Sequence, residues 1–274
     1  MAATALPTFY ISHGGGPCFW MESTPPTLWD QLGASLKSLP RAVGVRPKAI
    51  LVVSAHWIER DFTIQTHPRP PMLYDYYGFP EHTYRLKYGA PGSPELASRV
   101  KALLAAARLP VQEDAERGYD HGLFVPFLLI YPQADIPTVQ LSIRADFDPA
   151  AHLALGRALA PLRSEGVLIV GSGFSFHNLR HFGDPEGRSK PFDDWLNETV
   201  CAASPEVRDA RLIEWEQAPS ARFCQPQEDH LVPLFVAAGA AGTDPGYRIY
   251  AERMQRLQIY VSSFQFGETA GKTD

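Results

Sequence analysis

The sequence predicts an α/β protein with a central, mostly parallel sheet flanked by helices. Short apolar runs rich in β-branched residues alternate with amphipathic stretches along the chain. The composition never shifts enough to mark a linker, and no internal repeat or low-complexity segment is visible. The length of 274 residues falls within the roughly 250–300 residues that one core sustains. We therefore expect a single domain over 1–274, with frayed tails at 1–7 and 268–274.

The first half of the chain contains two apolar runs that predict strands. The second of them is continuously apolar, as in a strand covered on both faces. Amphipathic or Ala- and Leu-rich stretches predict helices, and Asp120 is a candidate cap in front of an apolar segment. The predicted strands are Thr8–Ser12 and Ala49–Ala55, the predicted helices are Leu28–Leu39 and Pro94–Leu109, and the capped apolar segment is Leu123–Tyr131.

The second half repeats this alternation and ends with two strands. Strands are predicted over Ile136–Ile143, which alternates in polarity, and over the buried run 167–170 that leads into Gly171. The predicted helices are Pro149–Leu162, Phe192–Ala203 and His230–Ala241. The last two segments, Arg248–Met254 and Gln258–Phe266, predict a closing hairpin or two edge strands.

Composition and charge exclude several classes of protein. Lys and Arg number 25 against 30 Asp and Glu, a net charge of −5, which argues against nucleic-acid binding. The cysteines, Cys18, Cys201 and Cys224, are widely spaced and form no CxxC pair, so a cysteine zinc site and a disulfide scaffold are not expected. The N-terminus resembles no signal peptide, and no apolar run approaches the roughly 18–20 residues that span a membrane. We expect a cytoplasmic protein with no membrane contact.

Three histidines follow apolar strand runs, which makes them candidates for a shared site. His13 ends the first run and precedes three glycines, His56 ends the second, and His177 follows the run at 167–170. The carboxyl ends of strands in an open α/β sheet converge on one crevice. Imidazole is the commonest metal ligand. Any one of these residues alone is more often a hydrogen-bonded structural group, but His13 and His56 together favour a metal site.

The other histidines have local explanations that compete with a functional one. His121 follows the candidate cap Asp120, and His230 follows two acidic residues that suit the start of a helix. The remaining four have no comparable context and are interpreted as surface or loop residues: His67, His82, His152 and His181. Ser172 lacks the glycines two positions before and two positions after it that a Gly-x-Ser-x-Gly nucleophile elbow has, so it is not expected to be a nucleophile.

Several longer segments, taken together, resemble one known family. In chain order they are SHGGGP at Ser12–Pro17, SAHW at Ser54–Trp57, YDYYGFP at Tyr74–Pro80, YDHGLFVPF at Tyr119–Phe127, GSGFSFHNLR at Gly171–Arg180, EDHLVPLFVAAGAAG at Glu228–Gly242 and SSFQFG at Ser262–Gly267. The chain resembles the extradiol aromatic ring-opening dioxygenases of the DODA type, within the LigB-like class III group. The match extends over almost the whole chain in the expected order and implies a LigB-like single catalytic domain.

The resemblance implies a role for each of the five histidines. His13, His56 and His230 would bind the metal, His177 would be the acid–base residue, and His121 would contact substrate or oxygen. LigB-like relatives place a glutamate where His230 stands, so Glu228 and Asp229 are open candidates for a carboxylate ligand. Fe(II) is expected for activity, while three imidazoles also suit Zn(II) in purified protein.

The activity implied by the resemblance is extradiol cleavage of a small, DOPA-like catechol. O2 would be inserted beside the diol to give a ring-opened semialdehyde. Two alternatives remain open: a zinc-dependent hydrolase on the same scaffold, and a non-enzymatic, MEMO-like binding protein. The expected substrate wall comprises Trp57, Tyr74, Phe124 and Phe174. The expected partners are a small aromatic diol and O2, and the protein is expected to be a monomer or a homodimer.

Overall fold

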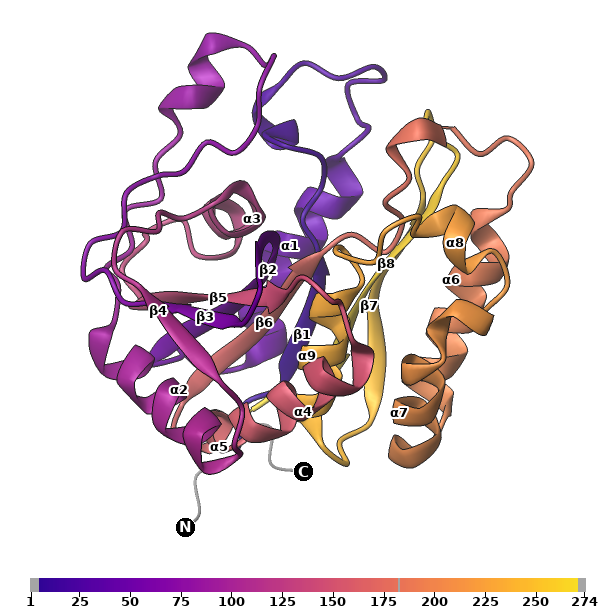
Figure 1. Cartoon of the computed structure of the whole chain (residues 1–274). Coiled ribbons are helices and arrows are strands. Elements are labelled where there is room, and N and C mark those ends of the chain that lie inside the picture. The colour runs from indigo at the N-terminus through magenta and orange to yellow at the C-terminus, as the bar shows by residue number, and fades with distance from the viewer. Residues whose placement is uncertain (1–4, 182, 271–274) are drawn as a thin grey trace.

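The apolar runs of the sequence form the centre of one eight-stranded sheet (Figure 1). A computed structural model describes residues 5–181 and 183–270. The strand order is β4-β3-β5-β2-β6-β1-β8-β7. The strands are β1 (Thr8–Ser12), β2 (Ala49–Glu59), β3 (Phe62–Gln65), β4 (Val111–Asp114), β5 (Thr138–Arg144), β6 (Val167–Gly173), β7 (Gly246–Arg253) and β8 (Tyr260–Phe266).

The inner strands β5, β2, β6 and β1 are parallel to their neighbours within this group, which confirms the predicted sheet. The chain's last two strands, β7 and β8, pair antiparallel with Tyr247 opposite Gln265, and β8 joins the sheet antiparallel to β1. The predicted closing pair is therefore confirmed. Because the inner strands are parallel, the carboxyl ends of β1, β2 and β6 all lie at the same end of the sheet.

Helices cover both faces of the sheet (Figure 1). α1 and α3 lie on one face, and α9 packs on β6 and β1 on the other face, where α4 covers it. The helices are α1 (Asp30–Val43), α2 (Pro94–Ala106), α3 (His121–Ile130), α4 (Pro149–Leu159), α5 (Pro161–Ser164), α6 (Ser189–Asn197), α7 (Pro205–Ile213), α8 (Ala221–Cys224) and α9 (Val232–Ala241). Short helical turns add η1 (Cys18–Trp20), η2 (Glu81–Arg85), η3 (Leu179–His181), η4 (Glu198–Ala202) and η5 (Trp215–Gln217). No helix in the described part of the chain is long and apolar enough to cross a membrane.

The helix α9 is buried on every side, because it lies between the sheet and α4. Its sequence is apolar all round, as expected for such a position. The backbones of α4 and α9 approach each other closely at a glycine in each helix. A Cβ atom on Gly239 would lie 2.2 Å from the carbonyl oxygen of Leu153, and one on Gly156 would lie 2.2 Å from that of Val236.

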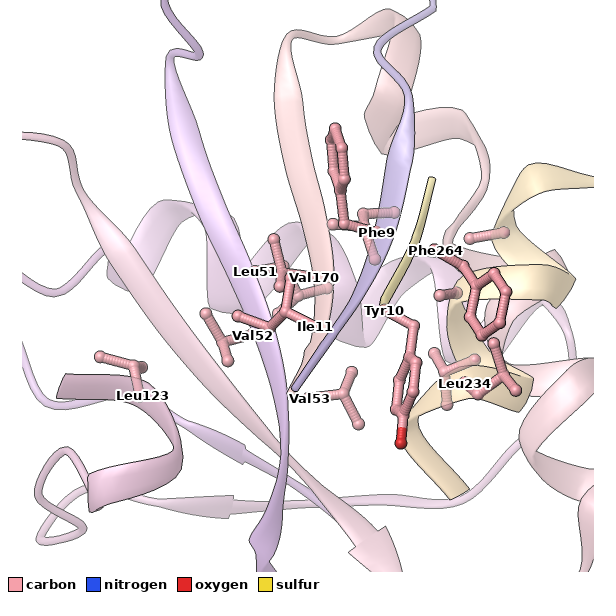
Figure 2. Packing of buried hydrophobic residues seen from close by; sticks show 14 of the residues in the cluster. Phe9, Tyr10, Ile11, Leu51, Val52, Val53, Leu123, Val170, Leu234 and Phe264 are labelled. Atoms are coloured by element: carbon pink, nitrogen blue, oxygen red, sulfur yellow. The ribbon is translucent and has the colours of Figure 1, made fainter. Parts of the chain in front are cut away.

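The core between sheet and helices includes side chains from both ends of the sequence (Figure 2). Tyr10 of β1, Leu234 of α9 and Phe264 of β8 are fully buried in it. Burial also extends into the expected tails. Leu6 is buried and its amide donates to Arg163, and the amide of Ala270 donates to Val43. The prediction of frayed tails is therefore wrong at these positions, while residues 1–4 and 271–274 of those tails lie outside the described residues.

Several elements differ from the predictions. The helix predicted from Leu28 begins at Asp30 and continues through Pro40 to Val43. β3, β4 and α7 were not predicted; β3 and β4 have only four residues each, too few to show a period. His152, interpreted as a surface or loop residue, is fully buried in α4. It accepts from the amide of Arg144 at 3.0 Å and contacts the carbonyl of Asp148 at 2.7 Å, so it joins α4 to β5.

Candidate metal centre and substrate cavity

Three histidines reach one point from three separate elements. His13 directly follows β1, and its amide donates to Gly173 at the end of β6. His56 lies in β2 where the pairing with β5 is irregular between Val53 and Ile58. Such an irregularity turns a side chain out of the regular alternation. His230 precedes α9, and its carbonyl accepts a hydrogen bond from the hydroxyl of Tyr10 at 2.8 Å.

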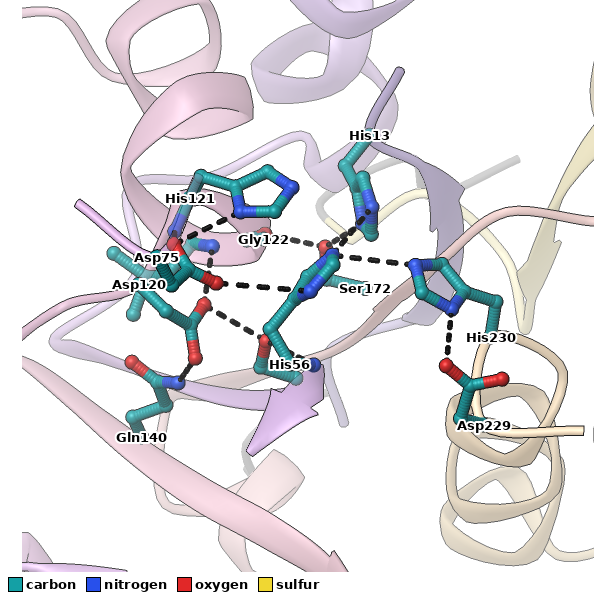
Figure 3. A network of polar contacts seen from close by, with 12 residues as sticks. His13, His56, Asp75, Asp120, His121, Gly122, Gln140, Ser172, Asp229 and His230 are labelled. Atoms are coloured by element: carbon teal, nitrogen blue, oxygen red, sulfur yellow. Dashed lines mark hydrogen bonds and ion pairs between the residues drawn. The ribbon is translucent and has the colours of Figure 1, made fainter. Parts of the chain in front are cut away.

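The Nε2 atoms of these three histidines converge (Figure 3). Nε2 of His56 lies 3.1 Å from that of His13 and 3.2 Å from that of His230. Metal–nitrogen bonds of about 2.0–2.1 Å place neighbouring ligand nitrogens roughly 2.9 Å apart at a right angle and about 3.3 Å apart at the tetrahedral angle. Both observed distances lie between these values. These spacings would let His56 share one metal ion with His13 and with His230.

Each of these imidazoles has an oxygen beside its other ring nitrogen. Nδ1 of His13 lies 3.1 Å from the hydroxyl of Ser172, which itself donates to the carbonyl of Gly122. Nδ1 of His230 lies 2.8 Å from Asp229, and Nδ1 of His56 lies 3.6 Å from Asp75. At His13 and His230 this acceptor favours the tautomer in which the Nε2 lone pair is free for a metal, whereas 3.6 Å at His56 is too long for a hydrogen bond.

Burial keeps three histidines of this site, His13, His56 and His177, neutral. Burial and the neighbouring imidazoles lower the pKa of both His13 and His56 well below the ordinary value. Burial, then His230, lowers the pKa of His177 to about 3, although Asp229 acts in the opposite direction. Burial alone would raise the pKa of Asp229, but its hydrogen bond to His230 and the nearby His177 outweigh burial and lower it. Neutral His13, His56 and His177 therefore lie close to an ionised Asp229.

The two remaining candidate histidines lie next to the ligand set. The ring of His177 stacks on that of His230 with centroids 3.3 Å apart, and its Nδ1 lies 3.8 Å from Asp229. The ring centroid of His121 lies 3.8 Å from that of His56. Its Nδ1 and its backbone amide are 2.9 Å and 2.8 Å from Asp75. The structure therefore brings all five predicted histidines together.

The position of the carboxylates distinguishes Glu228 from Asp229. Glu228 pairs with Arg222, at 2.5 Å, which directs it away from the histidines. Asp229 joins a group with His177 and His230 whose candidate ligand atoms all lie within 4.8 Å of one another. The atoms of His13, His56 and His121 form another such group. Because Asp229 already contacts Nδ1 of His230, its geometry suits orientation of that ligand.

All five histidines line a cavity of about 460 Å³. The three glycines after His13 line it too. Gly14 and Gly16 have φ values of +88° and +53°, the left-handed region that glycine adopts without strain, so the tight turn and the room for a substrate go together. The other lining side chains are largely aromatic or apolar: Cys18, Met21, Trp29, Tyr76, Phe79, Phe174 and Leu179, with Glu22 and Ser23.

This lining changes the predicted substrate wall. Phe174 lines the cavity, as predicted. Trp57 does not line it: the side chain is buried, donates to Glu59 at 2.9 Å and lies under the guanidinium of Arg117. Tyr74 also lies behind the wall, since its hydroxyl donates to the carbonyl of Leu86. Strand alternation explains Trp57, because neighbouring side chains of β2 point to opposite faces.

Phe124 lies in α3 and does not line the cavity. Tyr76, two residues after Tyr74, lines the cavity in place of Tyr74 and Phe124. The ring of Tyr76 packs on those of Phe79 and His121. The YDYYGFP segment containing Tyr76 was recognised in the sequence, but the choice among its tyrosines depends on how the loop folds.

Four polar residues that support the site were not predicted for this role. Asp75, Ser172 and Ser54 approach the histidines from three different segments. Asp120, predicted as a helix cap, does accept from the amide of Leu123, and it also accepts from Ser54 at 2.8 Å and from Arg117 at 3.1 Å. It is fully buried, and Gln140 donates to it as well. Only the placement of Asp75 and Asp120 beside aromatic and histidine motifs hinted at these contacts.

The family model for the catalytic LigB subunit of aromatic ring-opening dioxygenase matches residues 7–267. The chain belongs to the LigB family. It is therefore an aromatic ring-opening dioxygenase, which favours the oxidative function over the hydrolase and the binding protein.

Similar proteins are known in plants, bacteria and fungi. The chain is 40% identical to a 4,5-DOPA dioxygenase extradiol of Beta vulgaris, over 96% of this chain and 97% of that one. It is 34% identical to a protein of the same name from Escherichia coli K12, over 97% of both chains. It is 38% identical to the dioxygenase tasH of Hapsidospora irregularis, over 93% of this chain and 84% of that one.

A solved structure shares the LigB fold. The crystal structure of an uncharacterized protein from Escherichia coli K12 superposes with a TM-score of 0.74 at 32% identity, covering 96% of this chain and all of the other. The single α/β domain predicted from the sequence is thus found in a relative of similar length.

Proposed function

We propose that this LigB-family enzyme cleaves a small catechol beside its diol, with Fe(II) bound by His13, His56 and His230. The observation that carries the proposal is the convergence of their Nε2 atoms, 3.1 Å and 3.2 Å apart, in the lining of a largely aromatic cavity. The relatives named for 4,5-DOPA support a catechol with a short side arm.

Iron is the metal that suits this reaction. Bound Fe(II) would supply the redox chemistry that couples oxidation of the catechol to reduction of O2. Zinc binds three imidazoles equally well but has no redox chemistry, so a zinc form would be inactive in ring cleavage. His13, His56 and His230 would hold the ion, and all three also line the cavity that would receive the substrate.

His177 is the proposed acid–base residue. Its ring lies flat on that of His230 and lines the cavity, where it is neutral and able to accept a proton from a catechol hydroxyl. Asp229, close to Nδ1 of His177, would stabilise the resulting imidazolium. Overall, one ring C–C bond next to the diol breaks, and both oxygen atoms of O2 enter the semialdehyde product.

His121 is proposed to contact the substrate or oxygen on the side opposite His177. Asp75 accepts a hydrogen bond from the backbone amide of His121 and lies 2.9 Å from its Nδ1, beside the ring of His56. The wall residues Tyr76 and Phe174 would pack on the catechol ring and exclude water.

The test is anaerobic loading of the protein with Fe(II), followed by addition of a catechol panel under O2. We expect O2 uptake and a yellow ring-fission product. The absence of both across the panel would overturn the proposal, and hydrolysis of esters or amides by a zinc-loaded form would favour the hydrolase.

Two variants separate the roles of the histidines. His13→Ala should lose the metal, whereas His177→Ala should retain it and lose ring cleavage by roughly 10²–10⁴-fold. His67→Ala, which removes a half-buried imidazole outside the cavity, is the matched control. Full activity in His177→Ala would show that the base is a different group.

A further inference from the structure

The charges of the substrate cavity are unevenly distributed. Of the described residues that line it, none is a lysine or an arginine. The five histidines contribute to the lining, and most of its other side chains are apolar or aromatic. Glu22 is the single acidic residue in the lining, and it is exposed to solvent. A residue that both lines the cavity and meets solvent lies at its mouth, so the mouth has a negative charge with no positive counterpart in the lining.

The carboxylate of Glu22 is available to a ligand. Among the hydrogen bonds and ion pairs of the described residues, none involves its side chain, unlike Glu228, which Arg222 pairs. Arg256 donates to the carbonyl of Thr24, in the same loop as Glu22, at 3.4 Å but does not line the cavity.

The loop that carries Glu22 is held on both sides. Before it, the carbonyl of Trp20 lies 2.7 Å from Nε2 of His82. After it, the hydroxyl of Ser23 donates to the carbonyl of Pro25 at 3.0 Å. These contacts fix the backbone, so the carboxylate remains at the mouth while its side chain can adjust to a bound molecule.

With this distribution of charge, the binding of a catechol should depend on the charge of its side arm. With the diol at the histidines, an arm would extend between aromatic walls such as Trp29 and Phe79 toward the mouth. An ammonium group there would meet Glu22. A carboxylate would lose part of its hydration between apolar walls, meet no cation in the lining and be repelled by Glu22.

We propose that Glu22 is a specificity-determining residue that selects catechols whose side arm carries an ammonium group and no carboxylate. The substrate class is thus an aminoalkyl catechol. This inference rests on the proposed function, because it assumes that the diol lies at the histidines. A zwitterionic arm, as in DOPA, should rank between an amine arm and a carboxylate arm.

The experiment compares side arms on one ring. The Fe(II)-loaded protein is given 4-ethylcatechol, 4-(2-aminoethyl)catechol, 3-(3,4-dihydroxyphenyl)propanoate and DOPA. Two quantities are measured: kcat/KM from O2 uptake, and Kd by calorimetry without O2. We expect the amine to exceed the neutral catechol by roughly two- to fivefold, as for a partly exposed ion pair. The carboxylate should fall below the neutral catechol by about tenfold.

Charge variants at Glu22 make the test specific. Glu22→Gln should remove the advantage of the amine over the neutral catechol, and Glu22→Lys should reverse the order of amine and carboxylate. Glu214→Gln, which removes one exposed carboxylate outside the cavity, should keep the wild-type ratios.

Two failures are distinguishable. Ratios that stay the same in Glu22→Gln and Glu22→Lys, or a wild-type preference for the carboxylate arm, would overturn the proposal for Glu22 while ring cleavage stands. If none of the four catechols is cleaved, the proposed function is overturned. The ratios of Kd would then still decide whether Glu22 discriminates between catechols by the charge of their side arm.

Discussion

Asp75 shows how one carboxylate orients two imidazoles. It lies 2.9 Å from Nδ1 of His121 and 3.6 Å from Nδ1 of His56, and it accepts from the amide of His121. We predict that Asp75→Asn weakens metal binding by about 10–100-fold, because outer partners of ligating histidines have effects of this size. Metal content after dialysis against a graded series of chelator concentrations measures this.

The control for this variant is Asp135→Asn, which removes a carboxylate paired with Arg46 on the surface. Its metal content should match the wild type, since an exposed pair contributes little. Metal retention in Asp75→Asn equal to that of the control would contradict an orienting role for Asp75.

The buried His152 should make the free energy of unfolding depend on pH, independently of catalysis. Its Nε2 accepts from the amide of Arg144, so a proton there would point a donor at a donor. Burial lowers its pKa to about 4. The unfolded chain takes up this proton near pH 6.5, whereas the folded chain does so only near pH 4. The free energy of unfolding should therefore fall by about 3 kcal/mol as the pH drops from 6.5 to 4.

Urea unfolding across this pH range, in the wild type and in His152→Gln, isolates the effect. Glutamine has an oxygen that can accept from the Arg144 amide but no group that titrates. The variant should lose stability less steeply between pH 6.5 and 4. Equal slopes in the two proteins would show that other groups cause the acid sensitivity.

At the scale of elements, the crossing of α4 and α9 depends on two glycines. A methyl group on Gly239 would lie 2.2 Å from the carbonyl of Leu153, which is backbone and cannot rotate away. The helices would have to separate, and α9 directly follows the segment that holds His230. We predict that Gly239→Ala lowers the free energy of unfolding by about 1–3 kcal/mol, measured by urea unfolding.

Gly89→Ala provides the comparison, because a Cβ atom at Gly89 has no neighbour within 4 Å. It should leave the free energy of unfolding close to that of the wild type or raise it slightly. If Gly239→Ala is as stable as Gly89→Ala, the close approach of α4 and α9 does not limit packing.

At the scale of the whole molecule, metal binding should stabilise the fold. The three proposed ligands lie just after β1, in β2 and in the segment before α9, and only the folded chain brings them together. A hundredfold excess of metal over its Kd adds about 2.7 kcal/mol, or roughly 5–10 °C in Tm for a protein of this size. Chelation should lower Tm by this amount.

Metal replacement separates stability from chemistry. Adding Fe(II) to the chelated protein should restore both Tm and ring cleavage, whereas Zn(II) should restore Tm alone. His13→Ala should show little change in Tm with either ion. A Tm that does not respond to chelation in the wild type would contradict the proposed metal site.

The sequence by itself determined the sheet, most helices and the five histidines of the site. Buried strands can be predicted from the sequence because they are apolar over several consecutive residues. His13 and His56 stand at or near the ends of such runs. Short or partly exposed elements such as β3 and β4 carry no period, so pattern alone does not reveal them. The prediction of frayed tails failed at Leu6 and Ala270 because the partners of these residues are far away in the sequence and meet them only in the folded chain.

Only the tertiary structure decided which side chains surround the histidines. Trp57 and Tyr74 looked suitable as substrate wall, but a wall position depends on the direction of a side chain. Strand alternation and loop folding turned these residues away and brought Tyr76 in. Asp75 and Ser172 lie beside the imidazoles although they are far from them in the sequence, through contacts that no local pattern encodes. The sequence determines which chemical groups are present near the ends of strands, and packing determines which of them face each other.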